Sequence, residues 1–534
     1  MSALLHHGVS AQAQARPQSL AVACAGERLS YGELEVASNR LAHLLRAAGC
    51  ARGDRVALAM PKSPTAIVAM LGALKAGAAY VPMDPDGPPA RQARMLQVAD
   101  CRFLLAAGRV GPKLHETLAQ AGLARPPRIG WLDDAARAPA DPAPDFSLAD
   151  LAAQPAHAPR CAAATADLAL ILFTSGSTGA PKGVMLAHAS VAHFLRWACA
   201  HFGITSADRL SQHAPLRFDI STFDIYGALW SGAELHLVPA ELNLLPHKLA
   251  QLMREARLTQ WFSVPAALNL MAKFDVVAQG DLPSLRRVLF AGEVLPTPTL
   301  RYWMQRLPHV RFTNLYGPTE TTISSSWYDV PCCPQDERAP LPIGTAIPGE
   351  ALLVLDARRR PVPPGDTGEL YIAGAGLSPG YWRDPARTAQ VFVPRPGRPH
   401  ERMYRTGDLA RLGRDGLVYF LGRADTQIKC RGYRIELGEI EAALHTLPGL
   451  RESAVVAIAS EGFQGSLICC AYAPAPGTTP RALRAGLAGL LPAYMLPARW
   501  LRCEALPRNE SGKVDRVALR AAFQSADARL EEAA

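Results

Sequence analysis

The chain has 534 residues, of which 49% are hydrophobic, 19% charged and 7% aromatic, and its formal net charge is +9. This length and apolar content exclude disordered and fibrous classes and predict about three to four structural units. Lys and Arg are dispersed, and no aromatic residues interleave with the densest basic group, residues 358–360. We therefore expect no nucleic-acid partner.

The cysteines and the apolar stretches indicate the compartment. The eleven cysteines form no C-x-x-C pair, and the adjacent pairs at 332–333 and 469–470 suit neither a zinc site nor a disulfide framework. Residues 1–17 lack the charged flank and apolar run of a signal peptide. The longest apolar stretch, 67–83, contains Lys75 and two glycines and falls short of the roughly 20 apolar residues of a membrane span. We expect a soluble, cytoplasmic protein without membrane contact.

Strand and helix patterns alternate along the first part of the chain. Apolar strand patterns at 55–59 and 168–173 are followed by helical patterns at 64–75 and 188–200. This alternation predicts an α/β fold with largely parallel sheets. The Pro- and Ala-rich stretch 125–160 has little periodicity and is expected to form a long irregular connection.

A second, smaller domain is expected after residue 422. A turn at 422–423 leads into 427–430 and a helical pattern at 437–447, then strand patterns at 454–458 and 467–471 and a helix start at Thr479-Pro480. These parts predict a small α+β domain of about 110 residues. The expected domains are 1–422 and 423–534.

The segment 172–183, LFTSGSTGAPKG, has the composition of a phosphate-binding loop. Hydroxyl side chains alternate with glycines, and Lys182 supplies a cation, after an apolar strand and before an expected helix. The lysine follows Gly179 by three positions and precedes a glycine, so the loop is not a Walker motif.

This loop and further motifs resemble those of one family. They are LSYGEL at 29–34, LKAGAAYVPMD at 74–84, NLYGPTETT at 314–322, GELYIAG at 368–374, YRTGDL at 404–409, the segment 422–439 and NESGKVD at 509–515. In this order they resemble the adenylate-forming enzymes, specifically the amino-acid-activating adenylation domains of nonribosomal peptide synthetases. The resemblance covers nearly the whole chain and implies a large amino-terminal domain of layered sheets and helices with a small, mobile α+β carboxy-terminal domain.

The resemblance implies ATP and Mg²⁺ as cofactors. The reaction joins a carboxylate to the α-phosphate of ATP, releases pyrophosphate, and then passes the acyl group to a thiol. Glu320 is implied as the Mg²⁺ ligand, and Lys513, Lys182, Thr174 and Glu320 as the catalytic set. The implied nucleotide-binding residues are Thr174, Ser175, Gly176, Ser177, Thr178, Gly179, Lys182, Asn314, Tyr316, Gly317, Thr319, Asp408, Tyr419 and Arg423.

Two half-reactions on one site imply a rotation of the small domain. By resemblance, Asp425 is the hinge, and Lys513 acts in adenylation. Lys429, Arg431 and Gly432 lie in the loop that faces the site during thioester formation.

The resemblance also places the amino-acid pocket. Asp219 is implied as the partner of the α-ammonium group, an opposite charge that selects for amine-bearing acids. The remaining positions are almost all apolar, so we expect an apolar side chain of modest size. The implied substrate-binding set is Asp219, Ile220, Phe223, Phe262, Leu289, Ala291, Leu315, Ile323, Ser324 and Lys513.

The set is most similar to that of stand-alone ligases that activate L-proline for pyrrole biosynthesis. Departures at Ile220, Phe223, Phe262, Ile323 and Ser324 leave valine, isoleucine, leucine and nonproteinogenic ring amino acids open. His213 either borders the substrate channel or is a structural histidine. An acid:CoA ligase and a catalytically silent, carrier-binding scaffold are the alternatives to an amino acid ligase.

A separate carrier protein is the expected acceptor. No carrier-like segment follows Asp515, and no condensation-type His-His-x-x-x-Asp segment occurs. We therefore expect transfer to the phosphopantetheine thiol of another protein, and the net charge of +9 suits an acidic partner.

Overall fold

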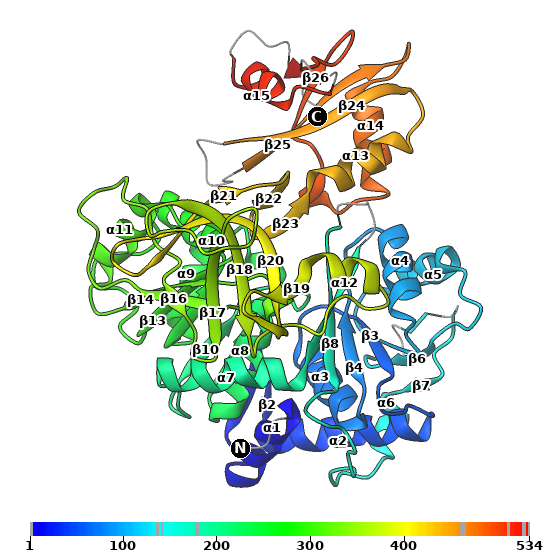
Figure 1. The fold of residues 1–534 in the computed structure, drawn as a ribbon. Helices are drawn as coiled ribbons and strands as arrows, with labels where there is room; N and C mark the ends of the chain where they lie inside the picture. Colours follow the sequence, from blue (N-terminus) through cyan, green and yellow to red (C-terminus); the bar gives the residue numbers. More distant parts are fainter. Residues whose placement is uncertain are drawn as a thin grey trace.

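The computed structural model describes residues 4–134, 138–139, 142–176, 181–459, 466–509, 513–525 and 530–531. Two layered sheets with their helices form the body of a large domain, a third sheet lies beside them, and a small domain lies on top (Figure 1). The predicted α/β class with a large first domain and a small α+β second domain is confirmed.

The first sheet has nine strands and is parallel over its centre. The pairs joining β1, β11, β10, β12, β13 and β14 are parallel, whereas the outer strands pair antiparallel. In spatial order the strands are β16 (Thr345–Ala346), β15 (Ser326–Asp329), β14 (Arg311–Tyr316), β13 (Arg287–Ala291), β12 (Gln260–Ser263), β10 (Arg209–Gln212), β11 (Glu234–Leu237), β1 (Leu20–Cys24) and β2 (Glu27–Ser30).

The second sheet has seven strands, parallel except for its last pair. In spatial order they are β7 (Phe146–Ser147), β6 (Arg128–Trp131), β5 (Phe103–Ala106), β3 (Arg55–Ala59), β4 (Ala79–Pro82), β8 (Leu168–Thr174) and β9 (Lys182–Ala187). The helices of the large domain are α1 (Leu5–Ala15), α2 (Tyr31–Ala47), α3 (Pro64–Ala76), α4 (Pro89–Ala99), α5 (Gly111–Ala121), α6 (Leu148–Ala152), α7 (His188–Phe202), α8 (Asp219–Ser231), η2 (Ala240–Leu242), α9 (Pro246–Glu255), α10 (Pro265–Lys273), α11 (Thr297–Arg306), η3 (Thr319–Thr321) and α12 (Pro385–Val391).

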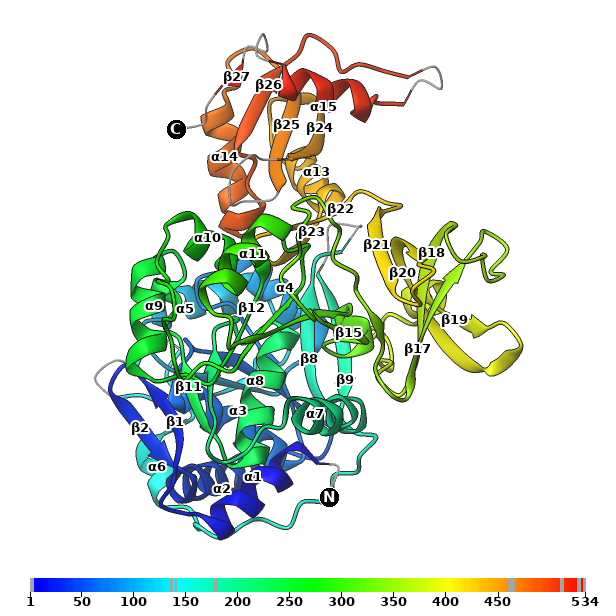
Figure 2. The ribbon, with the colours of Figure 1, turned by 90° about the vertical axis from the view of Figure 1, so that its left-hand side faces the viewer.

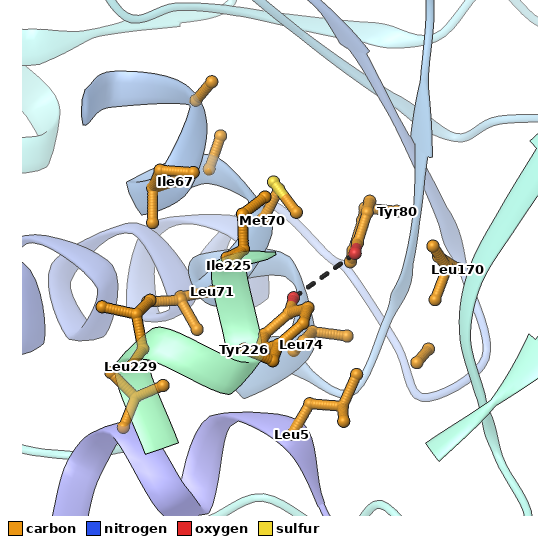
Figure 3. Packing of buried hydrophobic residues seen from close by; sticks show 14 of the residues in the cluster. Leu5, Ile67, Met70, Leu71, Leu74, Tyr80, Leu170, Ile225, Tyr226 and Leu229 are labelled. Carbon is orange, nitrogen blue, oxygen red and sulfur yellow. Dashed lines mark hydrogen bonds between the residues drawn. The ribbon is translucent and has the colours of Figure 1, made fainter. Parts of the chain in front are cut away.

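Helices α3 and α8 fill the core between the two sheets. Figure 3 shows apolar side chains of both helices packed together, with the Tyr226 hydroxyl donating to the Tyr80 hydroxyl at 3.4 Å. Helix α3 is buried almost throughout and is capped at both ends: Ser63 caps its first turn at the amide of Ala66, and Gly77 closes it with φ of 86°. The core therefore fixes α8, whose first residue is Asp219.

The third sheet and the small domain follow along the chain. The third sheet contains β17 (Glu350–Leu355), β18 (Thr367–Gly374), β20 (Arg398–Leu412), β19 (Phe392–Arg395) and β21 (Val418–Arg423). The small domain contains β22 (Gln427–Cys430), β23 (Tyr433–Glu436), α13 (Leu437–His445), β24 (Leu450–Ala459), β25 (Ser466–Pro474), α14 (Pro480–Ala488), η4 (Ala493–Met495), β26 (Arg499–Arg502), α15 (Arg516–Gln524) and β27 (Leu530–Glu531). Figure 2 shows the chain passing from β21 of the third sheet to β22 of the small domain.

Two local predictions are wrong. The stretch 125–160 is not simply irregular, because β6 pairs in parallel with β5 and buries Ile129 and Trp131, and β7 and α6 follow it. The loop after β8 leads not into a helix but into β9, which pairs antiparallel with β8. Val184 and Leu186 are both fully buried, which is the period of a strand.

No helix within the described parts of the chain is both long and apolar enough to cross a membrane.

A buried ion pair ties together the strands that lead to the site. Arg287 of β13 lies 2.6 Å from a carboxylate oxygen of Asp208, just before β10, and also donates to Gln260 of β12. Burial alone would raise the pKa of Asp208, but hydrogen bonds from Thr259 and Thr205 and the charge of Arg287 lower it. The Asp208 carboxylate is therefore ionised and depends on its partner.

We predict that Arg287→Met destabilises the large domain by about 3–5 kcal/mol, because it leaves a buried, unpaired carboxylate. Arg286→Met is the matched control: Arg286 is 58% exposed and 3.8 Å from Asp208, so its loss should change stability by less than about 0.5 kcal/mol. Calorimetric unfolding of both variants measures the difference, and equal effects would contradict this account.

Candidate active site

A cavity of about 140 Å³ lies between the large and small domains. It is lined by the end of β8, the start of α8, the loops after β13 and β14, parts of β20 and β21, and β22–β23 of the small domain. Its polar and charged lining residues are Asp84, Arg91, Gln92, Thr174, Ser175, Arg217, Asp219, Thr319, Thr406, Asp408, Arg423, Gln427, Lys429, Tyr433, Arg434 and Tyr494.

Glu320 is the most strongly paired carboxylate beside this cavity. It lies in η3, directly after β14, and is fully buried. The Tyr381 hydroxyl donates to its Oε1 at 2.7 Å, Lys182 Nζ lies 3.3 Å from the same oxygen, and Arg434 Nη1 donates to Oε2 at 2.7 Å. Burial opposes ionisation, yet the charges of Arg434 and Lys182 hold the pKa of Glu320 well below its usual range. Burial, followed by the charge of Arg434, lowers the pKa of Lys182 to about 8.

The chemistry of Glu320 fits Mg²⁺. A single buried carboxylate suits an ion that takes oxygen ligands and keeps water or phosphate as the others. Across the described ranges, no group of three or more His, Cys, Asp and Glu side chains could enclose a metal by itself. A metal held here would therefore take its other ligands from water or from a bound phosphate.

The predicted nucleotide residues after β14 and on β20–β21 come together. The Tyr316 hydroxyl donates to the Asp408 carboxylate, and Arg423 pairs with the same carboxylate. Asn314 lies on β14 and donates to the Pro342 carbonyl at 2.9 Å. Gly317 and Thr319 line the cavity.

Tyr419 is not brought to this group. Its hydroxyl donates to Asp415 at 2.6 Å, and it does not line the cavity. Phe420, the next residue, lies against Tyr316 instead, with ring centroids 6.5 Å apart. Successive side chains of a strand point to opposite faces, so a shift of one residue along β21 separates the two.

The glycine-rich loop is described in part. Thr174 and Ser175 line the cavity, and Gly176 follows them. Among the described residues, the buried Thr174 hydroxyl has no hydrogen-bond partner, which fits a place for a phosphate oxygen. The predicted residues Ser177, Thr178 and Gly179 lie outside the described part of the chain.

Asp219 lines the cavity at the first residue of α8. Its carboxylate accepts the Ile220 amide at 2.8 Å and a hydrogen bond from Thr319. Burial raises the pKa of Asp219 to about 6, partly offset by these hydrogen bonds. A carboxylate in this position is ready to pair with a cation.

The other predicted pocket residues, apart from Ser324 and Lys513, belong to the main apolar core of the large domain. Strand register places Phe262 beside Leu289, and Ala291 beside Leu315. Of this set, Ile220 lines the cavity together with Asp219. The buried Ser324 hydroxyl has no partner among the described residues. The clustered members are Ile220, Phe223, Phe262, Leu289, Ala291, Leu315 and Ile323.

The small domain presents the predicted loop, and not Lys513, to the cavity. Lys429 lies over the Tyr316 ring at 5.7 Å, and the Gly432 amide donates to Glu293 at 2.8 Å. A side chain on Gly432, whose φ is 81°, would come within 2.5 Å of Val264. Arg431 precedes it in the same turn, with φ of 53°. Lys513 is exposed and does not line the cavity.

Asp425 and His213 are two further predicted positions. Asp425, between β21 and β22, accepts hydrogen bonds from Arg423 Nε and Nη2, both at 2.7 Å. His213 does not line the cavity; it is buried with its ring centroid 5.0 Å from Trp261, and burial lowers its pKa to about 3. A neutral, packed histidine is the better description of His213.

Several interdomain residues were missed by sequence reasoning. Arg434 reaches Glu320, Glu293 holds Gly432, and Arg91 pairs with Glu439 of α13. Arg217 lies 3.1 Å from Asp84 and donates to the Tyr433 hydroxyl at 3.3 Å. All join segments more than a hundred residues apart, and the one available signal was the density of charged residues in segment 422–439.

Comparison with known proteins agrees with this geometry. The AMP-binding enzyme family model matches residues 9–382, and the AMP-binding enzyme C-terminal domain matches residues 439–513. A dimodular nonribosomal peptide synthase of Bacillus subtilis is 39% identical over 95% of the chain, but the chain spans only 21% of that protein.

Two solved structures are similar over most of both chains. The Vibrio cholerae adenylation domain AlmE, in complex with glycyl-adenosine-5'-phosphate, gives a TM-score of 0.84 at 26% identity, covering 98% of each chain. PA1221, which contains adenylation and PCP domains, gives 0.77 at 30% identity, covering 97% of this chain and 84% of that one. The chain therefore belongs to the AMP-binding enzyme family, as an adenylation domain of the nonribosomal peptide synthetase type.

Proposed function

We propose that the protein activates an apolar amino acid, with L-proline favoured, as its aminoacyl-AMP. It then transfers the aminoacyl group to the phosphopantetheine thiol of a separate carrier protein. The observation that carries this proposal is the placement of Asp219 in the same cavity as Thr174 and Asp408. A carboxylate for an ammonium group thus faces hydroxyl and carboxylate groups suited to a nucleotide.

The nucleotide is proposed to lie between the loop after β8 and the end of β20. Asp408 would accept the ribose hydroxyls, Asn314 and Tyr316 would hold the adenine, and Thr174 with Lys182 would bind phosphate oxygens. When bound at Glu320, Mg²⁺ would offset phosphate charge. Because phosphoryl transfer depends on positioning and charge, these residues need no covalent role.

The amino acid is proposed to enter with its ammonium on Asp219 and its side chain toward the apolar cluster. Because Phe223, Phe262 and Leu289 are apolar, they support a substrate with an apolar side chain. The departures from the proline-activating set at Ile220, Phe223, Phe262, Ile323 and Ser324 leave valine, isoleucine, leucine and nonproteinogenic ring amino acids as alternatives to proline.

Thioester formation is proposed to use the orientation of the small domain seen here, in which Lys429 and Gly432 line the cavity and Arg431 lies in the same turn. Adenylation would use another orientation, reached by rotation near Asp425, that brings Lys513 to the substrate. The exposure of Lys513 in this orientation supports two separate arrangements.

We predict that proline gives the strongest amino-acid-dependent exchange of pyrophosphate into ATP. The screen should cover the twenty standard amino acids, pipecolate and azetidine carboxylate. Strong exchange with valine and none with proline would reject proline, and the absence of exchange with every amine-bearing acid would reject amino acid activation. Asp86→Asn, which alters an exposed carboxylate outside the cavity, should leave the preferred substrate unchanged.

We predict that Asp219→Asn lowers kcat/KM for the amino acid by about 100-fold or more, because an ammonium group loses its buried partner. In the unaltered protein, kcat/KM should fall as pH drops below about 6, since protonated Asp219 cannot pair with the ammonium. Pyrophosphate exchange measured from pH 5 to 8 tests this. The Asp219→Asn variant should not show this fall of kcat/KM at low pH. An unchanged fall in the variant would assign the titration to another group.

We predict opposite effects for changes at Lys513 and Gly432. Lys513→Ala should reduce adenylation about 100-fold or more yet leave thiol transfer from a supplied aminoacyl adenylate largely intact. Gly432→Ala should do the reverse, because its side chain would collide with Val264 and strain a positive φ. Single-turnover assays of each half-reaction measure both, and equal loss of the two steps in either variant would contradict the division.

A further inference from the structure

We infer that the Arg434 guanidinium and a divalent cation occupy the Glu320 carboxylate in turn, so that metal binding expels the small domain from the orientation seen here. The inference deepens the proposed function and rests on its assignment of Mg²⁺ to Glu320. It makes Arg434 a positioning residue that takes the place of the metal between the two half-reactions.

Both oxygens of Glu320 are already used in this orientation. Oε1 faces the Tyr381 hydroxyl and Lys182, and Oε2 accepts from Arg434 at 2.7 Å. The carboxylate is fully buried, so it has no solvent-facing side for a further ligand. A metal that binds Glu320 must therefore displace one of these groups.

Of these three groups, Arg434 is the one that a metal would displace at the lowest cost in free energy. Lys182 and Tyr381 both belong to the large domain, and they keep their places whichever way the small domain turns. Arg434 belongs to β23 and is brought to Glu320 by the small domain alone. A divalent ion beside both Arg434 and Lys182 would gather four positive charges around one carboxylate, and like charges in a buried site repel strongly.

The guanidinium is coupled to the backbone that orients the small domain. The carbonyl of Arg434 accepts the Ser175 hydroxyl at 2.7 Å, and its Nε donates to Gln427 at 2.8 Å. Two residues earlier, the Gly432 amide is held by Glu293. Because Arg434 is held at both its backbone and its side chain, its expulsion from Glu320 loosens the contact between β23 and the large domain.

A second interdomain ion pair provides an internal reference. Arg91 of α4 pairs with Glu439 of α13, and neither residue contacts Glu320 among the described contacts. This pair should favour the same orientation without responding to metal. The two pairs therefore separate a metal-specific effect from a general weakening of the interface.

The experiment measures domain orientation against metal by energy transfer. Leu244 in the large domain and Val517 in the small domain are 70% and 72% exposed and are suited to a labelled non-natural amino acid. The full chain is saturated with α,β-methylene-ATP and compared in EDTA and in excess Mg²⁺. No amino acid is present, so failure here leaves the pyrophosphate exchange result untouched, and the converse also holds.

For the unaltered protein, Mg²⁺ should raise the ratio of rotated to present orientation by about 5-fold or more. Arg434→Gln should remove this response, because the neutral amide no longer competes with the metal. Arg91→Gln should raise the ratio in both solutions while keeping the wild-type fold response. Electron paramagnetic resonance with Mn²⁺ should show tighter metal binding by Arg434→Gln than by Arg91→Gln.

The inference would be overturned by an unaltered protein whose orientation does not respond to Mg²⁺, or by an Arg434→Gln variant that responds as the unaltered protein does. Arg434→Lys covers the case in which Arg434→Gln does not fold. It retains the charge but loses the planar fork, so it should need a severalfold lower Mg²⁺ concentration for half-rotation. An unchanged midpoint for Arg434→Lys would equally reject the competition.

Discussion

The ionised carboxylate of Glu320, fully buried between the domains, constrains the rest of the structure. A buried charge is tolerated only when opposite charges and hydrogen bonds surround it. Its partners come from three distant segments: Lys182 from β9, Tyr381 from the loop before α12 and Arg434 from β23. The second sheet, the segment between β18 and α12, and the small domain must therefore meet at η3.

The common direction of the central strands explains where the cavity lies. Strands β10, β12, β13 and β14 run parallel, so their carboxyl ends and the loops after them share one edge. Asp219 follows β10, Gly292 follows β13, and Gly317 follows β14, and all three line the cavity. The Asp208–Arg287 pair fixes the opposite ends of these strands, so it positions the site without touching it.

The sequence allowed prediction of what is local and missed what joins distant segments. Strands β3 and β8 and helices α3 and α7 lie close to their expected places, because hydrophobic period and capping residues are encoded within each segment. The glycine-rich loop and Asp219 were found from short motifs. By contrast, Tyr419 and Phe420 differ only in which face of β21 they occupy, and a motif does not encode that face. Arg434 and Glu293 escaped notice because each matters through a partner more than a hundred residues away.

The proposed selection for an amine draws on the contrast between two aspartates of α8. Asp224 is fully buried, its carboxylate has no hydrogen-bond partner among the described residues, and burial raises its pKa well above the usual range. Burial therefore disfavours the charged form of Asp224. Asp219, one and a half turns earlier, lies at the helix amino terminus, where the Ile220 amide and the helix dipole favour its charge. Of the two, only Asp219 lines the cavity, so it is the α8 carboxylate that would meet the ammonium group of the proposed substrate.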